Sequence, residues 1–158
     1  TTVITSGSSH TLTADQSGTT FVLDKSSGAT TIDLPASAKS GMFFKFLLKQ
    51  GMSSDSWKIR TADRNSASGD QDLIIGTIVG IRDVAGTGFN NTVEVMEANG
   101  TAHNTVSIDD AILKNSYFTI TCIVPQSGGV NGLWMVDNAV FFVKSDISSF
   151  AGVFTDEA

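Results

Sequence analysis

The stretch "GATTIDLPASAKSGMFFKFLLKQ", residues 28–50, contains the pattern that decides the fold. An alternating run of apolar and polar residues stops at Pro35, which has no N–H to donate to a central ladder. Small residues follow as far as Gly41 and favour a compact turn. Residues 42–49 then resume the alternation with strongly apolar side chains. The stretch predicts two β-strands joined by a turn.

The second of these strands carries much of the expected core. Phe44, Phe46 and Leu48 share one face, because side chains at alternate positions of a strand point the same way. Lys45 and Leu47 lie on the other face, which is mixed in polarity. A strand with one apolar face and one mixed face is predicted to be central and partly covered on both sides.

Working outward, the same period recurs along the chain in short segments rich in Val, Ile, Phe and Thr, each bounded by turn residues. Within one of them, Gly76 and Gly80 indicate a bulge or a close backbone approach. Dense short strands with intervening turns predict an all-β fold, an antiparallel β-sandwich or jelly-roll-like barrel. The further strand segments are 19–25, 56–61, 72–81, 91–97, 104–109, 116–125, 132–138 and 139–144.

Helical structure is predicted to be limited to one or two short turns. In residues 109–115, Asp109 or Asp110 is suited to cap a turn. Residues 35–41 form the other candidate, because Pro35 suits the first helical position and a glycine ends the segment.

The chain is expected to form one domain with an arm, since 158 residues suffice for a single core. Residues 1–13 are expected to be an extended N-terminal arm and residues 14–158 a single β domain. The arm either adds a strand to a neighbouring sheet edge or is a frayed terminus, and both interpretations remain open. The residues we expect to bind a partner are Thr2, Val3, Ile4, Thr5, Phe150 and Phe154.

Composition excludes several classes of function. Charged residues make up 16% of the chain, against about a quarter in ordinary soluble domains, and the net charge is -6. Such a surface repels phosphate backbones, so no nucleic-acid partner is expected. No apolar run is long enough to cross a bilayer, so no membrane partner is expected either. Cys122 has no second cysteine, and we expect a soluble protein made in a reducing compartment.

The chain lacks the residue patterns of a catalytic, metal or cofactor site. His10 and His103 lie among small polar residues, as solvated surface histidines usually do, and no G-x-S-x-G elbow is present, so we expect no enzyme activity. The acids Glu94, Glu97, Asp109 and Asp110 show no paired arrangement. Acidic loop 63–72 departs from the spacing of a calcium loop, and cation binding there is left open. We expect Trp57, Trp134 and Tyr117 to be in the core rather than on a sugar-binding surface.

The order of the segments resembles structural proteins of tailed-bacteriophage virions. The resemblance rests on "LTADQSGTTFVLDKSSGATTIDLPASAKSGMFFKFLLKQ", followed by "SWKIRT", "DLIIGTIVG" and a late "NGLWMVDNA". It covers most of residues 11–83 and the stretch 132–137. Among such proteins, small acidic chains of one domain are similar to capsid decoration, or cement, proteins.

This resemblance implies a non-enzymatic decoration protein on the outer face of the head shell, which it stabilises. The implied partners are the major capsid protein and two further copies of the chain in a homotrimer. The implied location is the exterior of the virion, after synthesis in the cytoplasm of the host bacterium. The alternative is a receptor- or glycan-binding module of a phage tail or head fibre.

Overall fold

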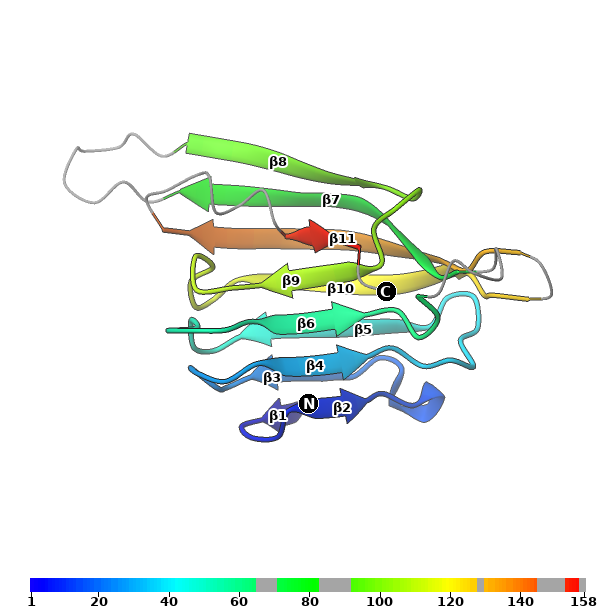
Figure 1. The fold of residues 1–158 in the computed structure, drawn as a ribbon, viewed down its shortest axis with the longest axis horizontal. Coiled ribbons are helices and arrows are strands. Elements are labelled where there is room, and N and C mark those ends of the chain that lie inside the picture. Colours follow the sequence, from blue (N-terminus) through cyan, green and yellow to red (C-terminus); the bar gives the residue numbers. More distant parts are fainter. Residues whose placement is uncertain (65–70, 83–91, 128–129, 145–152, 157–158) are drawn as a thin grey trace.

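The computed structural model describes residues 1–64, 71–82, 92–127, 130–144 and 153–156. These residues form two β-sheets, which overlie one another in Figure 1. The larger sheet has seven strands, in the spatial order β1 (Thr2–Ile4), β3 (Thr20–Leu23), β5 (Phe43–Leu48), β10 (Tyr117–Val124), β11 (Leu133–Val143), β7 (Leu73–Arg82) and β8 (Thr92–Asn99). The smaller sheet has five, in the order β12 (Phe154–Thr155), β9 (Thr105–Ile108), β6 (Trp57–Arg60), β4 (Thr30–Asp33) and β2 (Ser9–Thr11).

The first six strands alternate between the two sheets and form three stacked coils. Coil 1 contains β1 and β2, coil 2 contains β3 and β4, and coil 3 contains β5 and β6. All pairings between successive coils are parallel: β1 with β3 and β3 with β5 in the larger sheet, β2 with β4 and β4 with β6 in the smaller. The chain therefore passes through one sheet and then the other, and rises by one strand with each coil.

The remaining strands close this stack on one side. β10 pairs antiparallel with β5, and β9 pairs antiparallel with β6, so both sheets change direction at the same level. The larger sheet continues through β11, β7 and β8, with a parallel pair between β11 and β7. The described strands of the smaller sheet end with β12, paired antiparallel with β9.

The expected all-β class is confirmed, but antiparallel pairing throughout is wrong. Parallel pairs arise because each coil returns to the same sheet after visiting the other, so equivalent strands run in the same direction. A jelly roll is not confirmed, since both sheets are mixed and the described strands do not close into a barrel. Residues 2–11, expected to belong to an arm, contribute β1 and β2 to the two sheets.

One cluster of buried side chains has members from both sheets. Within it, the ring centroid of Phe46 lies 5.7 Å from that of Phe21 and 5.0 Å from that of Phe118. Phe118 in turn contacts Phe141 at 5.9 Å. This aromatic chain connects β3, β5, β10 and β11, and so joins the coils to the strands that close them. The expected core face of Phe44, Phe46 and Leu48 is confirmed.

Residues 28–50 form the two strands that their sequence predicts. β4 ends at Asp33, two residues before Pro35, and Gly41 has the positive φ of 83° that lets the chain enter β5. Residues 35–41 form turns rather than a helix. In the second helical candidate, the Asp109 carboxylate accepts a hydrogen bond from the Ala111 N–H at 2.9 Å, again within a turn.

The described helical structure is a 3-10 turn at Ala14–Gln16, which lies outside both predicted helical turns. Thr13 and Gln16 form a capping box around it, with the Thr13 N–H donating to the Gln16 side-chain oxygen at 2.9 Å. None of the helical structure in the described ranges has the length and apolar character needed to span a bilayer.

Candidate functional site: the open edges of coil 1

The clearest candidate site is the outer edge of coil 1, where both sheets end at the same side of the molecule. In Figure 1, β1 and β2 lie together at the bottom of the two layers. Among the described strands, β1 pairs with β3 and β2 with β4, so each has one unpaired side. We call these two unpaired sides the open edges. Such edges expose backbone groups that can pair with another chain.

Hydrogen bonds show which backbone groups point outward. In a strand, the N–H and C=O of one residue point to the same side, and successive residues alternate. The Ile4 carbonyl accepts from the Asp24 N–H at 2.9 Å, which orients Ile4 towards β3 and Val3 away from it. In β2, the Leu12 N–H donates to the Asp33 carbonyl at 2.8 Å, which leaves Thr11 pointing outward. Val3 and Thr11 therefore present donors and acceptors at the open edges.

Stacked turns hold coil 1 in place on coil 2. Lys25 Nζ donates to the Gly7 carbonyl oxygen at 2.9 Å and to Thr30 Oγ1 at 2.8 Å. Thr30 Oγ1 also donates to the Gly7 carbonyl at 3.1 Å. Gly7 has a φ of 90°, and a side chain there would contact the ring of His10. The turn between β1 and β2 is thus fixed, and the open edges are a preformed surface.

The structure places the expected partner-binding residues in three different settings. Thr2, Val3 and Thr5 are exposed at or beside β1, whereas the side chain of Ile4 is buried in the core. Phe154 is also buried, in β12 opposite Val106. Phe150 lies outside the described residues. Within this set, the exposed groups gather at the open edges of coil 1.

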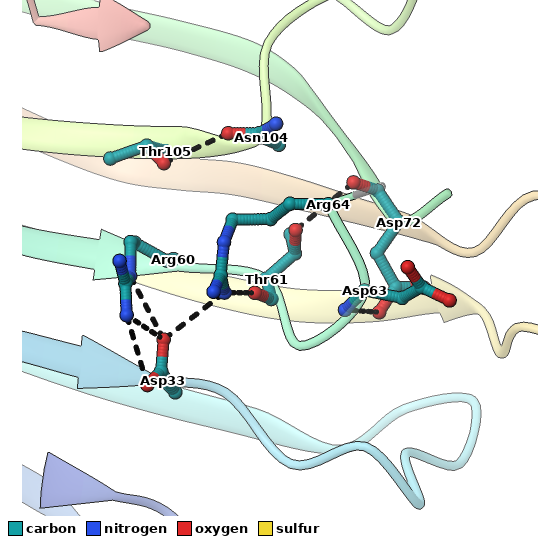
Figure 2. A network of polar contacts seen from close by, with 8 residues as sticks. All are labelled: Asp33, Arg60, Thr61, Asp63, Arg64, Asp72, Asn104 and Thr105. Atoms are coloured by element: carbon teal, nitrogen blue, oxygen red, sulfur yellow. Dashed lines mark hydrogen bonds and ion pairs between the residues drawn. The ribbon is translucent and has the colours of Figure 1, made fainter. Parts of the chain in front are cut away.

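A polar cluster at the C-terminal ends of β4 and β6 connects coils 2 and 3 (Figure 2). The Asp33 carboxylate accepts from Arg60 Nε at 2.9 Å and from a second guanidinium nitrogen of Arg60 at 3.2 Å. Arg64 Nη1 approaches the same carboxylate at 3.2 Å. All three side chains are largely removed from solvent. The two guanidinium groups donate charge-assisted hydrogen bonds to one acid, and these bonds connect the two coils.

The described end of the acidic loop 63–72 is built around buried Asp72. The Asp72 N–H donates to the Asp63 carbonyl oxygen at 2.8 Å, and Thr61 Oγ1 donates to the Asp72 carbonyl at 3.0 Å. Burial is the main cause that raises the pKa of the Asp72 carboxyl above its ordinary value. Asp63 accepts from Gln126 Nε2 at 2.9 Å. Within the described ranges, no three acidic, His or Cys side chains gather as a metal site would require. Asn65 and Asp70, which also carry side-chain oxygen atoms suited to a cation, lie outside those ranges.

The candidate catalytic residues are dispersed. His10 Nε2 lies 3.0 Å from the Ser6 carbonyl oxygen, and the ring of His103 packs 5.9 Å from that of Phe154. Two of the four candidate acids are engaged in local structure. Asp110 pairs with Lys144 at 3.5 Å, Asp109 caps its turn, and Glu94 and Glu97 lie on opposite faces of β8. Neither a triad nor an acid pair facing a cleft is assembled from these residues.

Trp57 and Trp134 are buried, as predicted, whereas the expectation that Tyr117 lies in the core is wrong, because its side chain is exposed on the outer face of the larger sheet. Buried indoles cannot stack on a sugar. Cys122 is fully buried too, and burial raises the pKa of its thiol to about 11, with a smaller contribution from the charge of Asp72. The thiol is therefore held in its unreactive form.

No protein-family model, curated protein or solved structure matches this chain. The geometry described above defines two open edges whose outward backbone groups are available for pairing.

Proposed function

We propose that this chain is a non-enzymatic structural protein of a tailed-phage virion, which decorates the outer face of the head shell and stabilises it as a homotrimer. Its resemblance to virion proteins suggests the setting. The observation that carries the binding role is the pair of open edges on coil 1, because they offer backbone hydrogen-bond groups in two layers at once.

The open edges suit attachment to an extended segment of the major capsid protein. A segment that adds beside β1 gains hydrogen bonds from the Val3 backbone, and one beside β2 gains them from Thr11. Both sites are preformed by the stacked turns, so little ordering opposes binding. A protein that binds assembled shells but not dissociated subunits stabilises the shell by linkage, by about 2.7 kcal/mol per site at a hundredfold excess over Kd.

A second candidate function is a module of a tail or head fibre that binds a receptor or glycan. The stacked parallel coils favour it, since a coil of a neighbouring fibre segment could continue both sheets beyond β1 and β2. Buried Trp57 and Trp134 weaken the glycan-binding part of this alternative. Immunogold labelling of intact particles separates the two: an even coat of label indicates decoration, and label at one vertex or at the tail indicates a fibre.

The decoration role is tested with shells that lack this protein. We expect added wild-type protein to bind them and to raise the temperature at which they release DNA. The double variant Val3→Pro with Thr11→Pro removes one outward N–H from each open edge and should abolish binding. The matched control, Val3→Ala with Thr11→Ala, keeps both N–H groups and should bind. Shells with equal heat tolerance with and without bound protein would overturn the stabilising role.

A further inference from the structure

The outer face of the larger sheet carries one continuous row of apolar side chains. Pairing aligns one residue from each strand, in the order Val3, Val22, Leu47, Tyr117, Val140, Val79 and Val95. We call this set the outer row. Its members alternate along their strands with core residues, so they face away from the smaller sheet. Six inter-strand spacings of about 4.8 Å give the outer row a length of roughly 29 Å.

Four of the seven members of the outer row are exposed, and Val22, Val140 and Val79 between them are half-buried. Val3 retains 53% of its accessible surface, Leu47 37%, Tyr117 36% and Val95 63%. A shorter apolar row runs beside it, from Phe142 to Ile81 and Val93. Contiguous apolar surface of this extent is unusual on an isolated protein and marks a contact with another molecule.

A hollow lies beside the centre of the outer row, and Val140 and Val79 of that row line it. The pairing between β11 and β7 shifts between Val136 and Val140, and Asn138 there has a φ of 44°. The resulting hollow of about 440 Å³ is lined by Val79, Met135, Asp137 and Val140, among others. Gly76 permits the close approach of β7 to β11 on its border, because any side chain would collide with the Val136 carbonyl oxygen. The face therefore has a recess on one side of β10.

The outer face of the larger sheet can pack against the same face of a second copy with β10 at the centre, because β10 is the fourth of the seven strands. A two-fold rotation about an axis parallel to β10 places β5 of one copy over β11 of the other, and β3 over β7. Val22 and Leu47 then face the hollow of the second copy, and Tyr117 lies at the axis. With the axis parallel to β10, the β10 strands of the two copies run parallel, which lies within the range of about 30° that aligned sheets adopt.

The charges beside the outer row obey the same symmetry. In the neighbouring row, Lys45 of β5 and Asp137 of β11 flank Thr119 of β10. Lys45 is exposed, and its Nζ lies 5.6 Å from the centre of the Phe43 ring. The two-fold rotation brings each Lys45 over Asp137 of the second copy, which makes two opposite-charge contacts. A random partner surface would not be expected to match this pattern.

We propose that two copies of this chain pack face to face through the outer row, related by a two-fold axis along β10. The available face is about 29 Å long and strands of about six residues make it about 20 Å wide, or roughly 600 Å². This is close to the roughly 800 Å² per partner that stable interfaces bury. The contact is isologous, so it differs from the three-fold contact of a homotrimer, and two trimers joined through it would form a hexamer. It leaves the outward backbone groups of the open edges free.

The first test measures the molar mass of the wild-type chain by light scattering across a hundredfold range of concentration. We expect the mass to double as concentration rises. Leu47→Asp places a charge in the outer row and should prevent the doubling. Val130→Asp is the matched control, because Val130 is similarly exposed but lies outside both sheets, and should leave it intact. Circular dichroism checks that each variant is folded. Equal assembly by wild type and Leu47→Asp would overturn the proposal.

A charge exchange tests the orientation. Lys45→Asp and Asp137→Lys should each raise the dissociation constant about tenfold or more, because each puts like charges opposite one another. Combining them restores opposite charges across the two-fold axis, and the double variant should regain most of the wild-type affinity. A double variant that binds no better than the single variants would overturn the proposed two-fold arrangement.

Discussion

The two sides of the stack of coils differ in how each sheet ends. On the β5–β6 side, antiparallel strands β10 and β9 cover coil 3 in both layers. On the β1–β2 side, the described chain adds nothing beyond coil 1, and both layers stop at the open edges. The reversal of strand direction thus ends the repeat on one side, whereas the other side keeps the geometry that a further strand pair requires. Under the proposed function, the closed side contributes stability and the open side contributes binding.

Phe46→Ala should have the largest effect, because it interrupts the aromatic chain that joins coils 2 and 3 to β10. Loss of a buried phenyl ring usually costs about 3–5 kcal/mol of the free energy of unfolding. Urea denaturation measures the change. Ile123→Ala, at an exposed position of β10, should cost about 0.5 kcal/mol. Similar losses for both variants would mean that the two parts are not joined through this chain of rings.

Asp33→Ala should have the next largest effect, since it leaves Arg60 and Arg64 without the carboxylate that they share. Hydrogen bonds to charged groups contribute about 1.5–3 kcal/mol each, and partial exposure places the expected loss near the lower value. Thermal unfolding measures it. Asp110→Ala, which removes the exposed contact with Lys144, is the control and should be milder. Equal shifts for the two variants would contradict a stabilising role for the cluster.

Asp72→Asn should change the pH dependence of stability. The pKa of the Asp72 carboxyl is raised in the folded chain, so protonation stabilises the fold. This contribution is complete below the ordinary carboxyl pKa and is lost as pH rises through the raised value. The variant cannot titrate, so its stability relative to wild type should increase with pH across that window. Urea unfolding from pH 3 to 7 measures the difference, and parallel profiles would contradict the assignment.

The smallest effect is expected for Cys122, whose thiol should hardly react with a thiol reagent while the chain is folded. Its thiol is buried and its pKa is about 11, so little thiolate is present at pH 8. We expect a thiol reagent to label the unfolded chain quickly and the folded chain at the rate of global unfolding. Rapid labelling of the folded chain would show that the core beside β10 opens locally.

The sequence predicts much of the individual strands and little of their assembly. Alternation correctly identifies the core face of β5, and Pro35 and Gly41 mark the end of β4 and the approach to β5. The parallel coils are not evident, because the spacing between paired strands is irregular. Thr2 pairs with Phe21, 19 residues on, and Phe21 pairs with Phe46, 25 residues on. Uneven turns therefore hide the repeat from any fixed-period search.

The open edges and the outer row also differ in how far they could be predicted from the sequence. Val3 and Ile4 in an N-terminal segment of high strand propensity could be identified from sequence as a pairing element. The outer row could not, since Leu47, Tyr117 and Val140 are far apart in the chain and become neighbours through strand order alone. Sequence pattern assigns Leu47 to a mixed strand face, and the topology turns that face into a continuous surface.

Hydrogen exchange of the Val3 and Thr11 amides tests the central claim most directly, which is that the open edges are the site of attachment. Both N–H groups should exchange quickly in the free protein, because they point away from their sheets. In the particle-bound protein, both should be strongly protected, while the amides of β9 and β10 should change little. Unchanged exchange at Val3 and Thr11 on binding would contradict attachment through the open edges.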